Sequence, residues 1–262
     1  MTFNLTRAGK ICYNVPSYIG FVVRLRRKEK MSTKIIAVRH GYSEANYKEV
    51  FTGQSNIVLT EVGLEQARLC GEFFKDWCPH SASGEERDDK IWDYGVSGID
   101  AVYASDLKRA YDTALPIGEA LGLPVQKCEA LREICAGEWE MVPFAEIDEK
   151  YPEEYGIWRN DIGRAACVGG ERVEDLSRRV LDEVRNIAVR HEGGAVVLVT
   201  HATPIRAMCA AAHGLDALDM GRERWVSNAS ISIFEFDGSL KTINTNIVSH
   251  LGALKTDLPN NV

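Results

Sequence analysis

The stretch that most constrains this chain is residues 35–38, Ile-Ile-Ala-Val, which runs straight into Arg39-His40-Gly41. Four consecutive apolar residues are typical of a strand that is covered on both faces, as in a parallel sheet packed between helices. The triplet that ends the strand has two interpretations. It is either a solvated turn, in which glycine supplies the bend and arginine faces water, or the edge of a binding site. The rest of the chain has to decide between them.

Two further strand-like runs, Asp100–Ala104 and Ala195–Thr200, lead into helical patterns as the first one does. Strands that alternate with helices indicate an α/β chain with a mainly parallel sheet. Residues 230–245 are typical of a hairpin around Asp237-Gly238, which adds an antiparallel part. We therefore predict an α/β three-layer sandwich, in which helices flank a mainly parallel central sheet.

Helix ends and inward faces can also be predicted. Thr60 is a suitable N-cap for a helix over residues 61–77. The side chains expected to line or flank its inward face are Leu69, Phe73, Trp77, Cys70 and Phe74. A second helix is interrupted at Pro116 and ends at Gly122. A third covers about residues 171–191, with these side chains directed inward: Val173, Leu176, Val180, Val184 and Ile187.

The composition excludes several classes of protein. The chain has 262 residues and a net charge of −7, whereas non-specific nucleic-acid binding needs a basic surface. We therefore expect no nucleic-acid partner. No apolar run is long enough to span a membrane. The seven cysteines are scattered without a C-x-x-C spacing, which is typical of a reduced, cytoplasmic protein rather than of a disulfide framework.

The first 30 residues differ from the rest, because they carry seven lysines and arginines against one glutamate. We predict that residues 1–32 are a poorly ordered basic extension, or that the start belongs at Met31. A contact with a membrane surface is the alternative. Residues 33–262 should form a single domain, with a polar insertion near residues 80–98 that lacks periodicity. Whether the protein forms a homo-oligomer is left open.

Charged and imidazole groups follow each of the three predicted strands. In an open parallel sheet, ligand groups gather just beyond the carboxyl ends of the strands. Here these positions carry Arg39-His40, then Ser105 and Arg109, and then His201. Two guanidinium groups suit a phosphate dianion. Two imidazoles add a nucleophile and a hydrogen-bond donor, so we expect phosphoryl transfer at this edge rather than anion binding alone.

Phosphoryl transfer to an imidazole also needs a proton for the leaving oxygen. The segment LREICAGEWE, residues 131–140, is a loop candidate with three carboxylates, Glu133, Glu138 and Glu140. Glu133 follows an apolar turn residue and precedes a Cys-Ala-Gly break, so it could point into a pocket. The residues alone do not choose among the three.

These residues belong to an ordered set of motifs that resembles the histidine phosphatase superfamily, in its phosphoglycerate-mutase-like branch. The resemblance runs from about residue 34 to residue 254 and is specific because the motifs occur in order. It begins with Arg39-His40-Gly41, accompanied by Ser43, Glu44 and Asn46. It continues through FTGQSNIVLTEVGLEQA, YASDLKRAYDTA, LREICAGEWE, GGERVEDLSRRV, VTHATPIRAM and SNASISIFEF.

The resemblance implies a phosphoglycerate-mutase-like fold and a role for each matching residue. It implies that His40 is the phosphorylated nucleophile, that Gly41 lets its carbonyl fix the tautomer of that imidazole, and that Glu133 is the proton donor. The residues implied to bind the phosphoryl group are Arg39, Arg109, His201 and Asn46. Those implied to contact the substrate are Thr52 and Gly53. No metal and no cofactor are implied.

We therefore expect a metal-independent phosphomonoesterase that acts on a small phosphorylated metabolite through a phosphohistidine. A phosphoglycerate mutase is the alternative within enzymes, but no tyrosine or lysine follows Glu133 in ICAGEWEMVPF to hold the carboxylate of phosphoglycerate. A non-catalytic phospho-ligand binder should have lost His40 or Glu133. The acid phosphatase branch is disfavoured, since its R-H-G-x-R-x-P motif is matched here only by Arg-His-Gly followed by Tyr42-Ser43-Glu44, and its late His-Asp pair is replaced by His201-Ala202. Asn56 and Met141 stand where the family commonly has aspartate and glycine, which bears on substrate choice.

Overall fold

The computed structural model describes residues 31–75, 94 and 96–256. Residues 1–30 of the predicted basic extension, Trp77 and most of the predicted insertion near residues 80–98 lie outside the described residues, so these predictions stay open. Residues from Ser32 onward form one compact unit.

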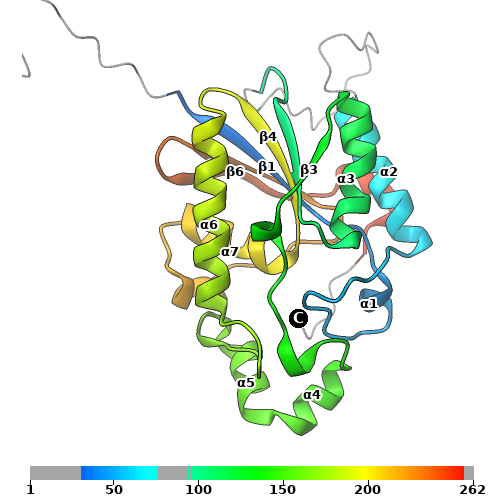
Figure 1. The fold of residues 1–262 in the computed structure, drawn as a ribbon, viewed down its shortest axis with the longest axis vertical. Coiled ribbons are helices and arrows are strands. Elements are labelled where there is room, and N and C mark those ends of the chain that lie inside the picture. The colour runs from blue at the N-terminus through cyan, green and yellow to red at the C-terminus, as the bar shows by residue number, and fades with distance from the viewer. Residues whose placement is uncertain (1–30, 76–93, 95, 257–262) are drawn as a thin grey trace, which may run out of the picture. The chain divides into compact units, whose positions relative to one another are not determined.

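A mixed six-stranded sheet with the order β3-β2-β4-β1-β5-β6 forms the middle of this unit (Figure 1). Its strands are β1 (Thr33–Arg39), β2 (Ala101–Ala104), β3 (Val125–Lys127), β4 (Ala195–Thr200), β5 (Ile231–Phe236) and β6 (Leu240–Ile247). The first four strands run parallel, and β5 pairs antiparallel with both β1 and β6. The three predicted strands and the terminal hairpin are confirmed.

Helices cover both faces of the sheet, so the predicted three-layer sandwich is also confirmed (Figure 1). The helices are α1 (Glu44–Tyr47), α2 (Glu61–Lys75), α3 (Lys108–Leu121), α4 (Phe144–Lys150), α5 (Pro152–Asn160), α6 (Val173–Arg190) and α7 (Ala202–Ala212). Short 3₁₀ helices cover Glu129–Leu131, Gly137–Trp139, Ile162–Arg164, Ala217–Arg222 and Ser249–Leu254. None of the described helices combines the length and the apolar character needed to cross a membrane.

The alternation of side chains along β1 divides the core into two layers. Ile35 and Ala37 belong to the layer beneath α6 and α7, whereas Ile36 and Val38 belong to the layer beneath α2 and α3. All four side chains are fully buried, because successive side chains of a strand point to opposite faces and both faces are covered. The continuous apolar run is therefore a strand covered on both faces, as predicted.

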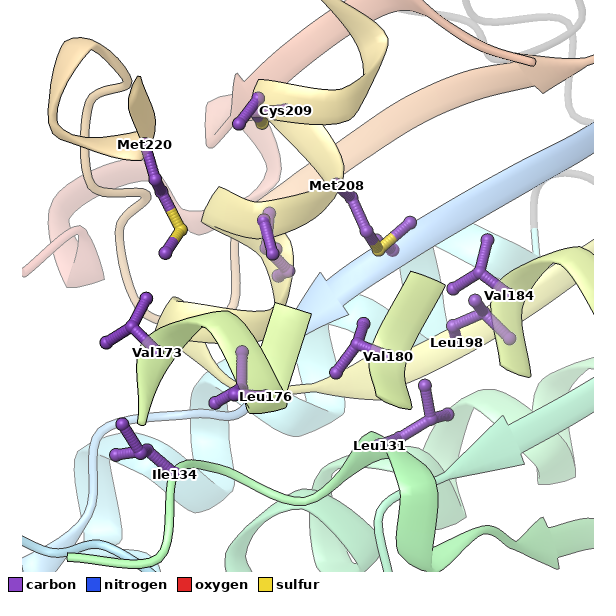
Figure 2. Close-up of a cluster of buried hydrophobic side chains, with 14 of the residues drawn as sticks. Leu131, Ile134, Val173, Leu176, Val180, Val184, Leu198, Met208, Cys209 and Met220 are labelled. Carbon is purple, nitrogen blue, oxygen red and sulfur yellow. The ribbon is translucent and has the colours of Figure 1, made fainter. Parts of the chain in front are cut away.

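The inward face of α6 agrees with its sequence pattern. Val173, Leu176, Val180, Val184 and Ile187 are all buried, as predicted. Figure 2 shows that side chains of α6 pack between Met208 of α7, Leu198 of β4 and the loop that carries Leu131 and Ile134. This packing brings the 131–134 loop, which contains Glu133, against α6.

Two predictions about α2 and α3 need correction. The buried face of α2 is centred on Cys70 and Phe74, while Leu69 and Phe73 are only partly buried. The helix α3 runs through Pro116 without a break and ends at Gly122 in the left-handed conformation. The backbone of Gly71 leaves no room for a Cβ beside Pro116. This close contact fixes the rotation of α2, and helix packing offsets the cost of a proline inside α3.

Candidate active site

The predicted site residues lie at one edge of the sheet. Strands β2, β4 and β1 are adjacent and parallel, so their carboxyl ends meet there. Arg39 ends β1 and is followed by His40, while His201 follows β4, and Arg109 lies in the first turn of α3. These four side chains are at most 5% exposed. Side chains from three separate segments are therefore gathered in one buried cluster, which we call the base of the pocket.

The imidazole of His40 is held neutral, and its neighbours fix which of the two ring nitrogens carries the proton. Its Nδ1 lies 2.8 Å from the carbonyl oxygen of Gly41, to which it donates, so Nε2 carries the lone pair. The Nε of Arg109 lies 3.3 Å from this Nε2. Burial, together with the positive charges of Arg109 and Arg39, holds the pKa of His40 well below its usual range. A neutral imidazole with a free lone pair is the form that can act as a nucleophile.

The position of His40 depends on a close backbone approach at Gly41. A Cβ on Gly41 would come within 2.5 Å of the carbonyl oxygen of Gly63 in α2. The amide of Gly41 also donates to the hydroxyl of Thr113 in α3, at 3.0 Å. From the other side, the side-chain amide of Asn228 donates to the carbonyl of His40, at 3.2 Å. Only glycine fits this junction, and it fixes the carbonyl that selects the His40 tautomer.

Arg109 is held by the loop that contains Gly53. Its Nη2 donates to the carbonyl of Gly53 at 2.8 Å, and its Nη1 donates to the carbonyl of Ser55 at 2.9 Å. Arg39 donates through Nη1 to the carbonyl of Val226 at 2.6 Å. Burial lowers the pKa of each guanidinium to about 10, so both stay cationic at neutral pH. The base therefore concentrates two fixed positive charges beside His40.

His201 contacts Ser105 through one ring nitrogen, and its ring packs against that of His40. Its Nε2 lies 2.8 Å from the hydroxyl oxygen of Ser105, and its ring centroid lies 5.2 Å from that of His40. Burial and the nearby Arg109 hold the pKa of His201 well below its usual range. When Ser105 donates its hydroxyl proton to Nε2, the neutral ring carries its own proton on Nδ1. His201 can then donate a hydrogen bond without adding a charge.

Two buried donors at the base have no hydrogen-bond partner in the part of the chain that the structure describes. They are Nε of Arg39 and Nδ1 of His201. Buried polar groups are normally hydrogen-bonded, because leaving one unpaired costs about 1–3 kcal/mol. An unpaired cationic donor beside a second unpaired donor is what an anion-binding site looks like before its ligand arrives.

The structure separates the three carboxylates that the sequence left open. Only Glu133 lines the pocket, where its carboxylate accepts from the backbone amides of Ile134, at 2.9 Å, and Thr203, at 3.4 Å. Glu138 is exposed and accepts from the hydroxyl of Tyr151. Of the three, Glu133 alone is placed to exchange a proton with a group in the pocket.

Glu140 does not line the pocket but holds the backbone of the loop around Gly53. Its carboxylate accepts from the amides of Gln54 at 2.7 Å, Ser55 at 2.8 Å and Ala136 at 3.1 Å. Gly53 lies so close to this carboxylate, with φ +51°, that a Cβ would clash with it. Glu140 therefore fixes the loop whose carbonyls hold Arg109.

Arg179 of α6 holds the loop that carries Glu133, a contact that the sequence did not suggest. Its guanidinium donates to three backbone carbonyls, those of Ala130 at 3.0 Å, Arg132 at 2.8 Å and Glu133 at 2.9 Å. It also forms a two-pronged ion pair with Glu171, at 2.8 and 2.9 Å. The second oxygen of Glu171 accepts from the amide of Cys135, at 3.2 Å. Both ends of the segment 130–135, which carries Glu133 and which we call the acid loop, are therefore held by this one ion pair.

The remaining predicted residues also reach the pocket. Asn46, Thr52 and Gly53 line it together with Arg39, His40, Arg109 and Glu133, while His201 lies fully buried beside His40. The Oδ1 of Asn46 accepts from Ser43 at 2.9 Å and from Asn228 at 3.2 Å, which orients its amide. The pocket has about 600 Å³ of empty space, including the part that is open to solvent.

Four aromatic residues that sequence reasoning missed complete the lining. They are Phe51, Phe144, Trp158 and Trp225, and we call them the aromatic wall. They come from the loop after α1, from α4, from α5 and from the loop before β5. The only signal in the sequence was the density of aromatic residues in the segment around α4 and α5. Within the described residues, no group of three or more histidine, cysteine, aspartate or glutamate side chains is placed to hold a metal.

Comparison with known proteins agrees with this geometry. The family model described as the histidine phosphatase superfamily (branch 1) matches residues 35–87 and 92–248. Phosphoserine phosphatase 1 of Hydrogenobacter thermophilus is 32% identical over 220 residues, which cover 84% of this chain and 94% of that protein. Glucosyl-3-phosphoglycerate phosphatase of Mycolicibacterium vanbaalenii is 31% identical over 209 residues, which cover 75% of this chain and 84% of that protein.

Solved structures show the same arrangement of elements. Bacillus stearothermophilus YhfR superposes with a TM-score of 0.71 at 26% identity, over 84% of this chain and 99% of that one. The mycobacterial glucosyl-3-phosphoglycerate phosphatase Rv2419c in complex with VO3 superposes with a TM-score of 0.69 at 27% identity, over 82% and 99% of the two chains.

Proposed function

The chain belongs to the histidine phosphatase superfamily, branch 1, and on that premise we propose that it is a metal-independent phosphomonoesterase acting on a small phosphorylated metabolite through a phosphohistidine at His40. The state of His40 carries the proposal. Its neutral ring donates from Nδ1 to Gly41 and keeps the lone pair on Nε2. The unpaired donors of Arg39 and His201 lie in the same buried cluster.

The first step transfers the phosphoryl group to His40. A phosphate dianion is bound by Arg39, Arg109 and the Nδ1 proton of His201, which match the charge on its non-bridging oxygens. Nε2 of His40 attacks phosphorus opposite the leaving oxygen, so that the P–N bond forms as the P–O bond breaks. The ring then carries a positive charge, which the carbonyl of Gly41 stabilises by accepting from Nδ1.

Glu133 serves both halves of the cycle. It gives its proton to the leaving alkoxide in the first step, which releases a neutral alcohol. In the second step its carboxylate takes a proton from water as the water oxygen attacks phosphorus. The P–N bond then breaks, inorganic phosphate leaves and His40 returns to its neutral form. The amides of Ile134 and Thr203 orient the Glu133 carboxylate for both transfers.

Phosphate release from a panel of phosphorylated metabolites, measured with and without EDTA, tests the proposal. We expect release that EDTA does not change and that His40→Ala abolishes, to below about 10⁻⁴ of the wild-type kcat. His213→Ala is the matched control, since His213 is half exposed and pairs with Glu223. A denaturing quench at high pH, where a P–N bond persists, should trap labelled phosphate on the wild type and on this control but not on His40→Ala.

Other outcomes of this experiment would point to other functions. Transfer of the label from the folded phosphoenzyme to phosphoglycerate instead of water would identify a mutase. Binding of phosphorylated compounds without any phosphate release would identify a phospho-ligand binder. Either result would overturn the phosphatase assignment.

A further inference from the structure

The aromatic wall forms one continuous apolar surface in the active-site pocket. The ring centroid of Phe51 lies 4.9 Å from that of Trp158 and 6.0 Å from that of Phe144. The ring of Trp158 lies 6.5 Å from that of Trp225. Phe51 and Trp158 also belong to the buried core, which holds these rings in place. The wall is therefore a rigid surface against which a flat group can pack with little loss of conformational entropy.

Charge in the pocket is confined to the base and to Glu133. Among the described residues that line the pocket, the only guanidinium or ammonium groups are Arg39 and Arg109, and Glu133 is the only carboxylate. The rest of the lining apart from the wall consists of His40 of the base, of Asn46 and of small or uncharged residues, namely Val50, Thr52, Gly53, Ile134, Ala202 and Thr203. The part of the pocket that receives the alcohol thus offers it no counter-charge.

One further arginine, Arg206, contacts the wall, but its guanidinium already donates hydrogen bonds to backbone carbonyls. The guanidinium of Arg206 lies 4.3 Å from the ring centroid of Trp225. It donates to the carbonyls of Met220 and Gly221, both at 3.1 Å, and only 7% of the residue is exposed. Arg206 supports the wall from behind, and it does not line the pocket.

These observations separate two kinds of phosphate ester. An ester whose alcohol carries a flat apolar face can exchange water for the wall, which is favourable in proportion to the apolar area buried. An ester whose alcohol carries a carboxylate would have that group stripped of water without a partner, which is unfavourable. Binding to the base is the same for both, because the base contacts only the phosphoryl group.

We propose that this pocket selects phosphate esters of uncharged alcohols with a flat, largely apolar face, and disfavours esters whose alcohol bears a carboxylate. The inference rests on the phosphatase activity proposed above and adds the substrate class. In this respect the chain would differ from relatives named for phosphoserine or glucosyl-3-phosphoglycerate, since both of those compounds carry a carboxylate.

Three substrates test the inference on the wild-type protein. The value of kcat/KM is measured for 2-phenylethyl phosphate, propyl phosphate and O-phosphoserine. The first two release alkoxides of similar basicity, so their ratio reports the packing of the ring. We expect a ratio of at least about 10, since even one methylene in an apolar pocket is worth about 10-fold or more. Phosphoserine should fall below propyl phosphate, although its alcohol is the better leaving group.

Substitutions in the wall locate the source of the ratio. Phe144→Leu and Trp225→Leu keep an apolar side chain at half-buried positions, so we expect folded proteins, which thermal melts would verify. Each should lower the ratio of phenylethyl to propyl phosphate about threefold or more, and together they should lower it further. Phe73→Leu is the matched control, because Phe73 is half-buried on α2 against Phe74 and His250 and does not line the pocket. That variant should keep the wild-type ratio.

The outcomes distinguish the inference from the function on which it rests. Absence of phosphate release from every substrate would overturn the phosphatase proposal itself. Release from all three with a phenylethyl-to-propyl ratio near 1, or with phosphoserine preferred, would leave the phosphatase standing and overturn the substrate class. A ratio that Phe73→Leu lowers as much as the wall variants do would also overturn it, because the preference would then not arise from the wall.

Discussion

The base of the pocket and the aromatic wall face the same cavity but are built in different ways. The base consists of side chains at the ends of β1 and β4 and at the start of α3, all fixed by the sheet and by buried hydrogen bonds. The wall comes from loops and from the short helices α4 and α5, and Phe144 and Trp225 are only half-buried. The base can therefore set the chemistry with little freedom, whereas the wall can vary the substrate without disturbing it.

The difference is also one of electrostatics. The base buries two guanidinium groups and two neutral imidazoles, which is costly unless an anion completes the cluster. The wall has no titratable group and is held by contacts among its rings and by the guanidinium of Arg206 over Trp225. Perturbations that act on protons or charges should therefore affect the base, and those that act on shape should affect the wall.

The largest effect that would sharpen this comparison is expected from Glu133→Gln. On propyl phosphate we expect a loss of about 10² to 10⁴ in kcat, because a poor leaving group needs a proton in the transition state. The burst of phosphoenzyme from 4-nitrophenyl phosphate should fall far less, since that leaving group needs no proton. Glu138→Gln, at an exposed position, is the control and should lose nothing. Equal losses on both substrates would remove Glu133 as the general acid.

Acid should destabilise the fold through its buried histidines, two of which belong to the base. The pKa values of His40 and His201 are held below the usual range by burial, and burial lowers that of His250 to about 4. The unfolded chain takes up these protons near pH 6.5 and the folded chain does not. The free energy of unfolding should therefore fall with falling pH, by about 1 kcal/mol per group between pH 6.5 and 5.5.

Urea unfolding at the two pH values measures this dependence. The wild type should lose about 2–3 kcal/mol in total. His201→Gln should reduce the loss by about 1 kcal/mol, whereas Trp225→Leu in the wall should leave it unchanged. A stability that stays constant between pH 6.5 and 5.5 would show that these buried histidines accept protons in the folded protein.

A smaller effect is expected from Arg179→Gln, which loosens the acid loop without touching the phosphoryl group. Losing the bonds to the loop carbonyls should misplace Glu133 and lower kcat about 10-fold on propyl phosphate, with little change in KM. The loss should shrink on 4-nitrophenyl phosphate, which mere loss of folded protein would not produce. Arg178→Gln, an exposed neighbour paired with Asp175, is the control. The same loss on both substrates would contradict a role in placing the acid.

The smallest effect concerns Met141, which precedes Val142 and Pro143 in the segment leading to Phe144 of the wall, with φ +61° and 37% exposure. A non-glycine residue in the left-handed region costs about 1–2 kcal/mol of backbone strain. Glycine removes this strain but costs about 0.5–1 kcal/mol more in conformational entropy on folding. We expect Met141→Gly to stabilise the protein by roughly 0.5–1 kcal/mol, seen as a rise of a few degrees in Tm, with the kinetics of propyl phosphate unchanged. A lower Tm would mean that the Met141 side chain contributes more by packing than its backbone loses by strain.

Local patterns in the sequence determined much of the fold and the base of the site. The apolar run at residues 35–38, the spacing along α6 and the Asp-Gly turn each report on their immediate neighbours, and all three predicted the observed elements. The placement of Arg39, Arg109 and His201 at strand ends also followed, because parallel strands bring their carboxyl ends together.

Tertiary structure decided everything that depends on contacts between distant segments. The choice of Glu133 over Glu140 rests on backbone amides 70 and 86 positions away, and the tether from Arg179 spans 46 positions. The wall gathers rings from residues 51, 144, 158 and 225. No local pattern encodes such a meeting, since each ring is simply an apolar residue in its own segment. Local sequence sets backbone conformation and the direction of side chains, whereas packing alone decides which of them meet.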